Sequence, residues 1–253
     1  MTCNLRPSPH LANTATRFAA HHLLKVQRLP CVFPSAWQFV TSMRSRKGRF
    51  ILISAWVSWA LVTALGVGVL WSYENAPGAR ATAPSSWPVD SSIRPATERA
   101  TLVMLAHPHC PCTRASIGEL DRLMAQAQGR LTAYVLFLKP AGSPDDWEKS
   151  DLWQSAARIP DVNVVLDDDG VESRRFHAMT SGQTVVYDNA GRLLFSGGIT
   201  RSRGHFGDNE GRSAIVSLLN AGEADRAETA VFGCPLYQTG SECREEEHDG
   251  HVH

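Results

Sequence analysis

The chain has 253 residues, of which 43% are hydrophobic, and this is enough for one packed domain with additional segments. Its 25 Lys and Arg residues are balanced by 25 Asp and Glu residues. This balance gives no excess positive charge for a polyanion, so we predict no binding to nucleic acid. The acidic residues are unevenly distributed, however, because none of them lies in residues 1–73.

Residues 1–49 form a basic segment that contains several prolines and shows no strong hydrophobic period. We expect this segment to be mostly disordered and cytoplasmic, with Cys3 and Cys31 as reduced bystanders. Met43 is followed at once by the basic run RSRKGR, which is typical of the start of a membrane-targeted chain and makes Met43 a candidate translation start.

Residues 50–71 contain no charged residue and are long enough, as a helix, to cross a hydrocarbon core about 30 Å thick. Trp71 and Tyr73 stand at the far end, where amphipathic rings favour the membrane interface. Basic residues precede this transmembrane helix and the first acid, Glu74, follows it. We therefore predict a single-pass protein of the cell membrane with an extracytoplasmic, periplasmic C-terminal domain. A signal peptide cleaved near residues 79–81 is the alternative, although the apolar run is long for that role.

The rest of the chain divides into three parts by composition. Residues 72–99 are rich in Ala, Pro and Ser, and we expect a linker that spaces the next domain from the membrane. Residues 100–222 alternate strand and helix patterns, which predicts an α/β domain with a mixed sheet. Residues 223–253 contain Cys and His without an apolar period, and we expect a flexible tail. The expected strands are residues 100–107, 131–138, 162–166, 184–188 and 192–197, and the expected helices are residues 112–128, 150–158, 171–178 and 209–221.

Two motifs carry a family resemblance. HPHCPCT, residues 107–113, follows the first strand and opens a helix, and SGQTVVYDNAGRLLFSGG, residues 181–198, reads as a later hairpin. In this order they resemble the thioredoxin-like superfamily, and this resemblance implies a three-layer α/β sandwich with a mixed β-sheet. HPHCPCT together with SGGITRSRGHFGDNEG, residues 196–211, is similar more narrowly to the membrane-anchored RedB-type proteins. Gln183 stands where thioredoxins carry a cis-proline, so we expect a trans peptide bond there.

The two cysteines of the first motif are the candidate catalytic residues. A thiol at a helix N-terminus meets the positive end of the helix dipole, which favours the thiolate. Cys110 precedes Pro111, so its backbone should be extended, and we expect it to be the more exposed, attacking thiol. Cys112 would be the resolving thiol. Thr113 occupies the position of the second thioredoxin cysteine and can donate a hydrogen bond to a thiolate.

This interpretation predicts a membrane-tethered thiol–disulfide oxidoreductase or redox partner that acts on protein thiols or disulfides and needs no cofactor. The alternative is a copper- or zinc-binding thioredoxin-like module or metallochaperone. In that case the metal ligands would be His107, His109 and His205 with the two cysteines, since thiolate and imidazole suit these metals. A third interpretation is that the motif is degenerate and that both thiols are inert and buried.

Two further features leave alternatives open. Cys234 and Cys243 lie in a loop-rich segment and would form a structural disulfide in an oxidising compartment, or would resolve an oxidised Cys110 by swinging in. Residues 197–211 are rich in glycine and also contain arginine, histidine and acidic residues. This stretch is either a surface turn before the last helix or a functional loop, and it reaches the cysteines only if it folds back.

Overall fold

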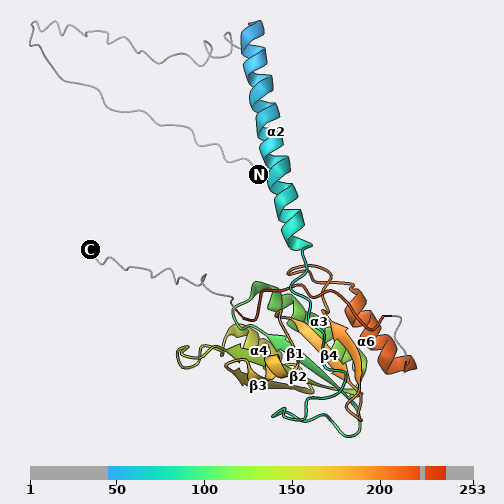
Figure 1. Cartoon of the computed structure of the whole chain (residues 1–253). Helices are drawn as coiled ribbons and strands as arrows, with labels where there is room; N and C mark the ends of the chain where they lie inside the picture. The colour runs from blue at the N-terminus through green and yellow to red at the C-terminus, as the bar shows by residue number, and fades with distance from the viewer. Residues whose placement is uncertain (1–44, 223–225, 238–253) are drawn as a thin grey trace, which may run out of the picture. The chain divides into compact units, whose positions relative to one another are not determined.

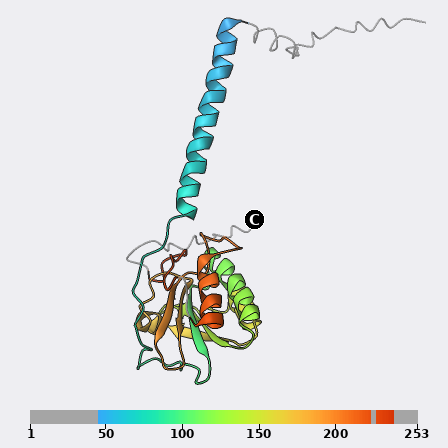
Figure 2. The same cartoon turned by 90° about the vertical axis from the view of Figure 1, so that its right-hand side faces the viewer.

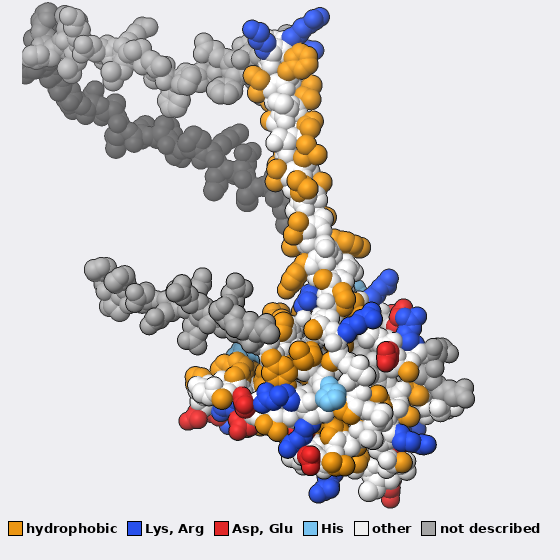
Figure 3. Space-filling model, in the orientation of Figure 1, with side chains coloured by type: hydrophobic (Ala, Val, Ile, Leu, Met, Phe, Trp, Pro, Cys, Tyr) orange, Lys and Arg blue, Asp and Glu red, His pale blue; other side chains and the backbone are white. Residues whose placement is uncertain are grey.

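The computed structural model describes residues 45–222 and 226–237. Most of the predicted disordered N-terminal segment and part of the predicted tail, including Cys243, therefore lie outside the described residues. Helix α2 (Arg46–Glu74) contains the whole predicted span. Figure 3 shows apolar side chains along its length, and none of its residues is buried. In the described part of the chain it is the one helix long and apolar enough to cross a membrane.

The domain is built on a five-stranded mixed sheet with the order β3-β2-β1-β4-β5 (Figure 1). Strands β1, β2 and β3 are parallel neighbours, whereas β4 runs antiparallel to both β1 and β5. This arrangement confirms the predicted thioredoxin-like α/β class, and each strand agrees with its sequence prediction within two residues. The strands are β1 (Ala100–Ala106), β2 (Leu131–Lys139), β3 (Val162–Asp168), β4 (Gln183–Tyr187) and β5 (Leu193–Gly197).

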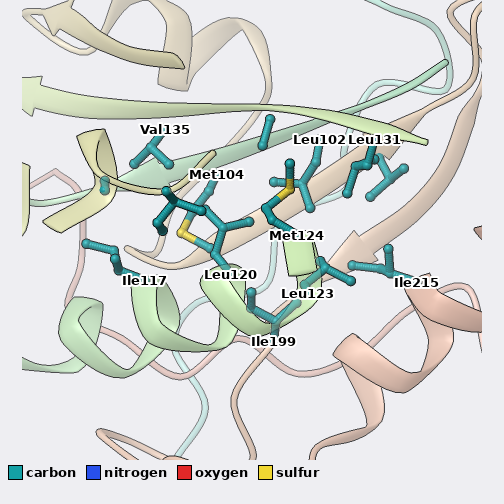
Figure 4. Close-up of a cluster of buried hydrophobic side chains, with 14 of the residues drawn as sticks. Leu102, Met104, Ile117, Leu120, Leu123, Met124, Leu131, Val135, Ile199 and Ile215 are labelled. Atoms are coloured by element: carbon teal, nitrogen blue, oxygen red, sulfur yellow. The ribbon is translucent and has the colours of Figure 1, made fainter. Parts of the chain in front are cut away.

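One face of the sheet is covered by helices α3 (Pro111–Ala127), α4 (Asp151–Ala157) and α6 (Glu210–Ala221). Figure 2 shows α6 and α3 beside each other on this face. The apolar side chains of α3 recur at helical spacing and point into the core drawn in Figure 4. This core includes Leu102, Met104, Ile117, Leu120, Leu123, Leu131, Val135 and Ile215.

The opposite face is covered by helix α5 (Val171–Arg175), the residues that follow it, and two extended segments. One of them lies within the expected linker. Ala83 and Ile93 are buried there, and the Trp87 ring packs edge-on against Tyr187 with ring centroids 5.2 Å apart. The Ser92 backbone N–H donates to Glu172 over 2.9 Å. This part differs from the free spacer that we expected, because the second face of the sheet is also apolar and must be covered.

The second extended segment is residues 226–237, which we expected to belong to a flexible tail. Glu228 forms a bridge with Ser196 beside β5, and Pro235 forms one with Thr180 just before β4. Leu236 is buried in the core of the second face. The tail prediction was wrong for these residues. The segment has no internal hydrophobic period because it is stabilised by pairing with distant backbone rather than by an amphipathic face.

Candidate active site

The two predicted cysteines lie where β1 passes into α3. Cys110 is the residue that precedes the helix, with φ −82° and ψ 119°, and Pro111 is the first helical residue. The extended backbone of Cys110 agrees with the restriction that a following proline imposes. The Cys110 carbonyl accepts the first hydrogen bond of the turn, from the Thr113 N–H over 3.0 Å. Both thiols therefore lie at the helix N-terminus, where the positive end of the helix dipole favours negative charge.

The exposure of the two thiols is the reverse of our expectation. Cys110 is buried, with 2% of its surface exposed, whereas Cys112 is only partly buried. The prediction that Cys110 is the more exposed thiol was therefore wrong. Its backbone does project as predicted, but the C-terminal segment 226–237 covers this end of the sheet, and no local pattern around Cys110 reveals that cover.

A third thiol completes the site. The Cys234 sulfur lies 2.9 Å from the Cys110 sulfur, across 124 positions of sequence. Cys110, Cys112 and Cys234 are all free thiols in the structure. The sequence left two roles open for Cys234, half of a structural disulfide or a resolving thiol. In the structure its side chain contacts Cys110.

The contact changes the acidity of both sulfurs. The hydrogen bond from the Cys234 thiol, together with weaker ones from Thr113, lowers the pKa of Cys110 to about 4, against the opposing effect of burial. The same contact and burial raise the pKa of Cys234. Burial and the nearby negative charge of Cys110 raise the pKa of Cys112. Near neutral pH the site therefore holds one thiolate, on Cys110, and two protonated thiols.

Thr113 and Ser181 connect the helix start to the third cysteine. Both side chains are buried, and their hydroxyl oxygens are 2.8 Å apart. The Ser181 hydroxyl accepts from the His107 N–H, and the Ser181 N–H donates to the Cys234 carbonyl, each over 2.8 Å. Ser181 thus forms hydrogen bonds with His107, Thr113 and Cys234. Sequence reasoning missed this residue, because a single serine before a strand carries no signal of its own.

Arg203 brings positive charge to the thiols from the glycine-rich loop. Its guanidinium lowers the pKa of both Cys112 and Cys234, although burial outweighs this effect at each thiol. It also donates to the Gly233 carbonyl over 2.5 Å. The loop containing Arg203 therefore folds back onto the cysteines, which resolves one of the alternatives left open by the sequence.

A buried carboxylate on α3 holds this loop in place. Glu119 accepts from the Gly207 N–H over 2.9 Å and from the Asn209 side-chain amide over 3.1 Å. The Arg212 guanidinium lies 3.4 Å from the carboxylate oxygen that accepts from Asn209. Arg203 is thus positioned through a loop that a fully buried charge anchors to the same helix that carries Cys112.

Two of the three predicted histidine ligands, His107 and His109, are neighbours, and the third, His205, belongs to the glycine-rich loop. His107 is half-buried, and burial lowers its pKa. His109 is exposed, and its ring centroid lies 6.1 Å from that of His107, with Trp147 packed against both rings. His205 is exposed in the loop. No group of three or more His, Cys, Asp or Glu in residues 45–222 and 226–237 is arranged to hold a metal ion. Metal binding stays a prediction.

The peptide bond before Gln183 is trans, as expected, since none of the described peptide bonds is cis. Gly182 precedes it with φ +87°, a conformation that glycine adopts without strain. Its N–H donates to the Leu105 carbonyl over 2.7 Å. This loop before β4 is the one against which Cys234 is paired, through the Ser181 N–H and the Cys234 carbonyl.

No protein-family model and no curated protein matches this sequence. Solved structures do resemble it. An uncharacterised conserved protein from Geobacillus kaustophilus is 16% identical, with 66% of this chain and 95% of that one covered and a TM-score of 0.48. A secreted disulfide oxidoreductase of Mycobacterium tuberculosis is 14% identical, with 49% and 83% covered and a TM-score of 0.35. An exposed lipoprotein thioredoxin of Streptococcus pneumoniae is 16% identical, with 49% and 85% covered and a TM-score of 0.37. The neighbours include thioredoxin-like proteins, and the fold assignment itself rests on the sheet topology described above.

Proposed function

We propose that this chain is a membrane-tethered, extracytoplasmic thiol–disulfide oxidoreductase or redox partner of the RedB type, with Cys110 as the attacking residue. The observation that carries the proposal is the 2.9 Å contact between the Cys110 and Cys234 sulfurs at the start of α3, a contact that lowers the pKa of Cys110. A thiolate is the nucleophile in thiol–disulfide exchange, and a neighbouring thiol is needed to release the product.

The reaction needs no cofactor. The Cys110 thiolate attacks one sulfur of a substrate disulfide, forms a mixed disulfide and releases the other substrate sulfur as a thiolate. A second thiol of the chain then attacks Cys110 and releases the remaining substrate thiol. The chain loses two electrons and the substrate disulfide gains them, and the reverse sequence oxidises a substrate dithiol. Protein thiols and disulfides are the substrate class.

Location at the membrane is supported by α2 and by the charge pattern around its apolar run. The basic residues before residues 50–71 and the acidic Glu74 after them favour a C-terminal domain outside the cytoplasm. That compartment is oxidising in bacteria, so an exchange-active thiol pair has both oxidised and reduced forms available there. The cell membrane and this orientation are part of the proposal.

The experiment that tests the function is a redox titration of the full chain in detergent. The chain is equilibrated with glutathione buffers of graded potential, and the remaining free thiols are counted by alkylation and mass spectrometry. We expect two thiols to disappear together in one reversible transition, and the Cys110→Ser variant to lose that transition. Absence of any reversible transition in the unsubstituted chain would contradict the proposal.

The metal-binding alternative predicts a different outcome in the same preparation. A copper- or zinc-binding module would retain stoichiometric metal and would show no reversible thiol couple. Its ligands would be drawn from Cys110, Cys112 and the histidines at 107, 109 and 205. Thiolate and imidazole donors are chemically suited to these metals.

A further inference from the structure

We propose that Cys234, and not Cys112, is the resolving thiol of Cys110, so that the oxidised chain carries a Cys110–Cys234 disulfide. This inference rests on the proposed function and assigns its second catalytic residue. It also gives the segment 226–237 a catalytic role, because this segment supplies one of the two reacting sulfurs. The segment itself lies outside the strand–helix pattern of the domain.

The distances favour Cys234. Its sulfur is 2.9 Å from the Cys110 sulfur, and a disulfide bond is about 2.05 Å long, so a small movement brings the two atoms to bonding distance. Cys112 lies in the first turn of α3, two positions after Cys110, which precedes that helix. A bridge between Cys110 and Cys112 would join residues only two positions apart, whereas the Cys234 sulfur already contacts the Cys110 sulfur from a distant segment.

The backbone around Cys234 keeps its thiol in place. The Ser181 N–H donates to the Cys234 carbonyl over 2.8 Å, and the Leu236 N–H donates to the Met179 carbonyl over 2.9 Å. Gly233 allows its segment to approach Ser181 closely, because a Cβ at this position would lie 1.9 Å from the Ser181 carbonyl oxygen. A thiol held against its reaction partner reacts as if it were present at very high concentration.

The chemistry of the pair balances without another reactant. The Cys110 thiolate attacks the substrate disulfide, and the first substrate thiolate leaves. Cys234 then gives up its proton, its sulfur attacks the Cys110 sulfur, and the Cys110–substrate bond breaks. The departing substrate sulfur takes up that proton. The Arg203 guanidinium, which already lowers the pKa of Cys234, would stabilise the negative charge on that sulfur as the proton leaves.

Cys112 then has no essential part in resolution. The sulfur in hydrogen-bond contact with Cys110 is that of Cys234, and the neighbouring thiol that attacks the mixed disulfide first releases the substrate. Replacing Cys112 with serine is therefore the matched control for replacing Cys234, since each substitution removes one thiol that neighbours Cys110.

The test uses the full chain in detergent, with Cys3, Cys31 and Cys243 replaced by serine so that only the three site cysteines react. The reduced protein is exposed to glutathione disulfide as the probe, quenched with acid, and analysed by intact mass and peptide mapping. We expect the background protein to form a Cys110–Cys234 disulfide. We expect Cys234→Ser to accumulate glutathione on Cys110 at least tenfold more than the background protein, and Cys112→Ser to resemble the background protein.

Each other outcome contradicts a distinct claim. Accumulation in Cys112→Ser but not in Cys234→Ser would show that Cys112 resolves, which overturns this inference and leaves the proposed function standing. Failure of every variant to react at Cys110 would overturn the proposed function itself. Circular dichroism of each variant shows whether it is folded, and a Cys234→Ala variant that folds repeats the trapping test should Cys234→Ser not fold.

Discussion

Gly233 and the Ser181 carbonyl oxygen approach so closely that a Cβ on the glycine would stand 1.9 Å from that oxygen. The backbone of this segment must move if any side chain is added. We expect Gly233→Ala to displace Cys234 from Cys110 and to lower the free energy of unfolding by about 1–3 kcal/mol, as overpacking typically does. The measurement is the yield of the Cys110–Cys234 disulfide after exposure to glutathione disulfide, together with a denaturant titration.

Gly222→Ala is a useful control, because that residue has open space around it and only its left-handed backbone is affected. An unchanged disulfide yield in Gly233→Ala would show that the close approach does not position Cys234.

The acidity of Cys110 gives a pH prediction. Its pKa is lowered from 9.0 to about 4 chiefly by the Cys234 hydrogen bond. The thiolate ultraviolet absorbance that is lost in Cys110→Ser should therefore titrate in the acidic range. Cys234→Ala removes the donor and should shift this titration upward, whereas Cys234→Ser keeps a hydroxyl donor and should shift it less. A titration of Cys110 near its ordinary value in the unsubstituted chain would contradict the assigned hydrogen bond.

The same shift has a consequence for stability. The folded chain holds Cys110 ionised at a pH where the unfolded chain holds it protonated, so unfolding takes up a proton. The contribution of Cys110 to the free energy of unfolding should therefore increase from about pH 4 toward pH 9.0 and disappear below the folded pKa. Denaturant titrations of the reduced chain and of Cys110→Ser across this range check the sign. A contribution that decreases with rising pH would be inconsistent with a stabilised thiolate.

Oxidation should stabilise the fold by an amount that identifies the disulfide. A Cys110–Cys234 bridge closes a very long loop, and loops of this size stabilise by about 4–5 kcal/mol in the chain-entropy description. The loss of the hydrogen-bonded thiolate offsets part of this gain. A Cys110–Cys112 bridge closes almost no loop and should stabilise very little. The measurement compares the denaturant midpoints of the oxidised and reduced chains, with oxidised Cys234→Ser as the control.

Glu119 should couple the glycine-rich loop to the thiols. Its carboxylate is fully buried and contacts Arg212, which is itself largely buried. Glu119→Gln removes the buried counter-charge of that guanidinium and leaves it only the exposed Asp208, 3.2 Å away, so we expect a loss of about 3 kcal/mol in the free energy of unfolding. We also expect slower resolution of the mixed disulfide, because Arg203 is positioned by the same loop. Arg114→Gln is the control, since Arg114 pairs with Asp151 at the surface and should cost no more than about 1 kcal/mol.

The topology prediction is tested in cells. A reporter enzyme that requires disulfide bonds for activity, fused after residue 253, should be active if the domain lies outside the cytoplasm. Deleting the basic run RSRKGR, which precedes the apolar run 50–71, should reduce that activity, because the positive charges hold the N-terminal side in the cytoplasm. An inactive but stable fusion would contradict the proposed orientation.

The strands, the helices and the apolar span could be predicted from the sequence because each is encoded by a local period. Strand β1 is an unbroken apolar run, α3 repeats its apolar residues at helical spacing, and residues 50–71 lack charge altogether. The position of Cys110 at a helix start was predictable for the same reason, since Pro111 fixes the backbone on both sides of it. Local sequence therefore determined the strands, the helices and the place of Cys110 before α3.

The remainder of the site was decided by tertiary structure alone. Cys234, Ser181 and Arg203 come from three segments that have no period of their own and are held by backbone hydrogen bonds to distant parts of the chain. The sequence of such a segment does not predict which other segment it pairs with, because a backbone N–H or carbonyl is the same at nearly every residue. This is why the burial of Cys110 and its contact with Cys234 emerged only from the folded chain, where segment 226–237 lies across the start of α3.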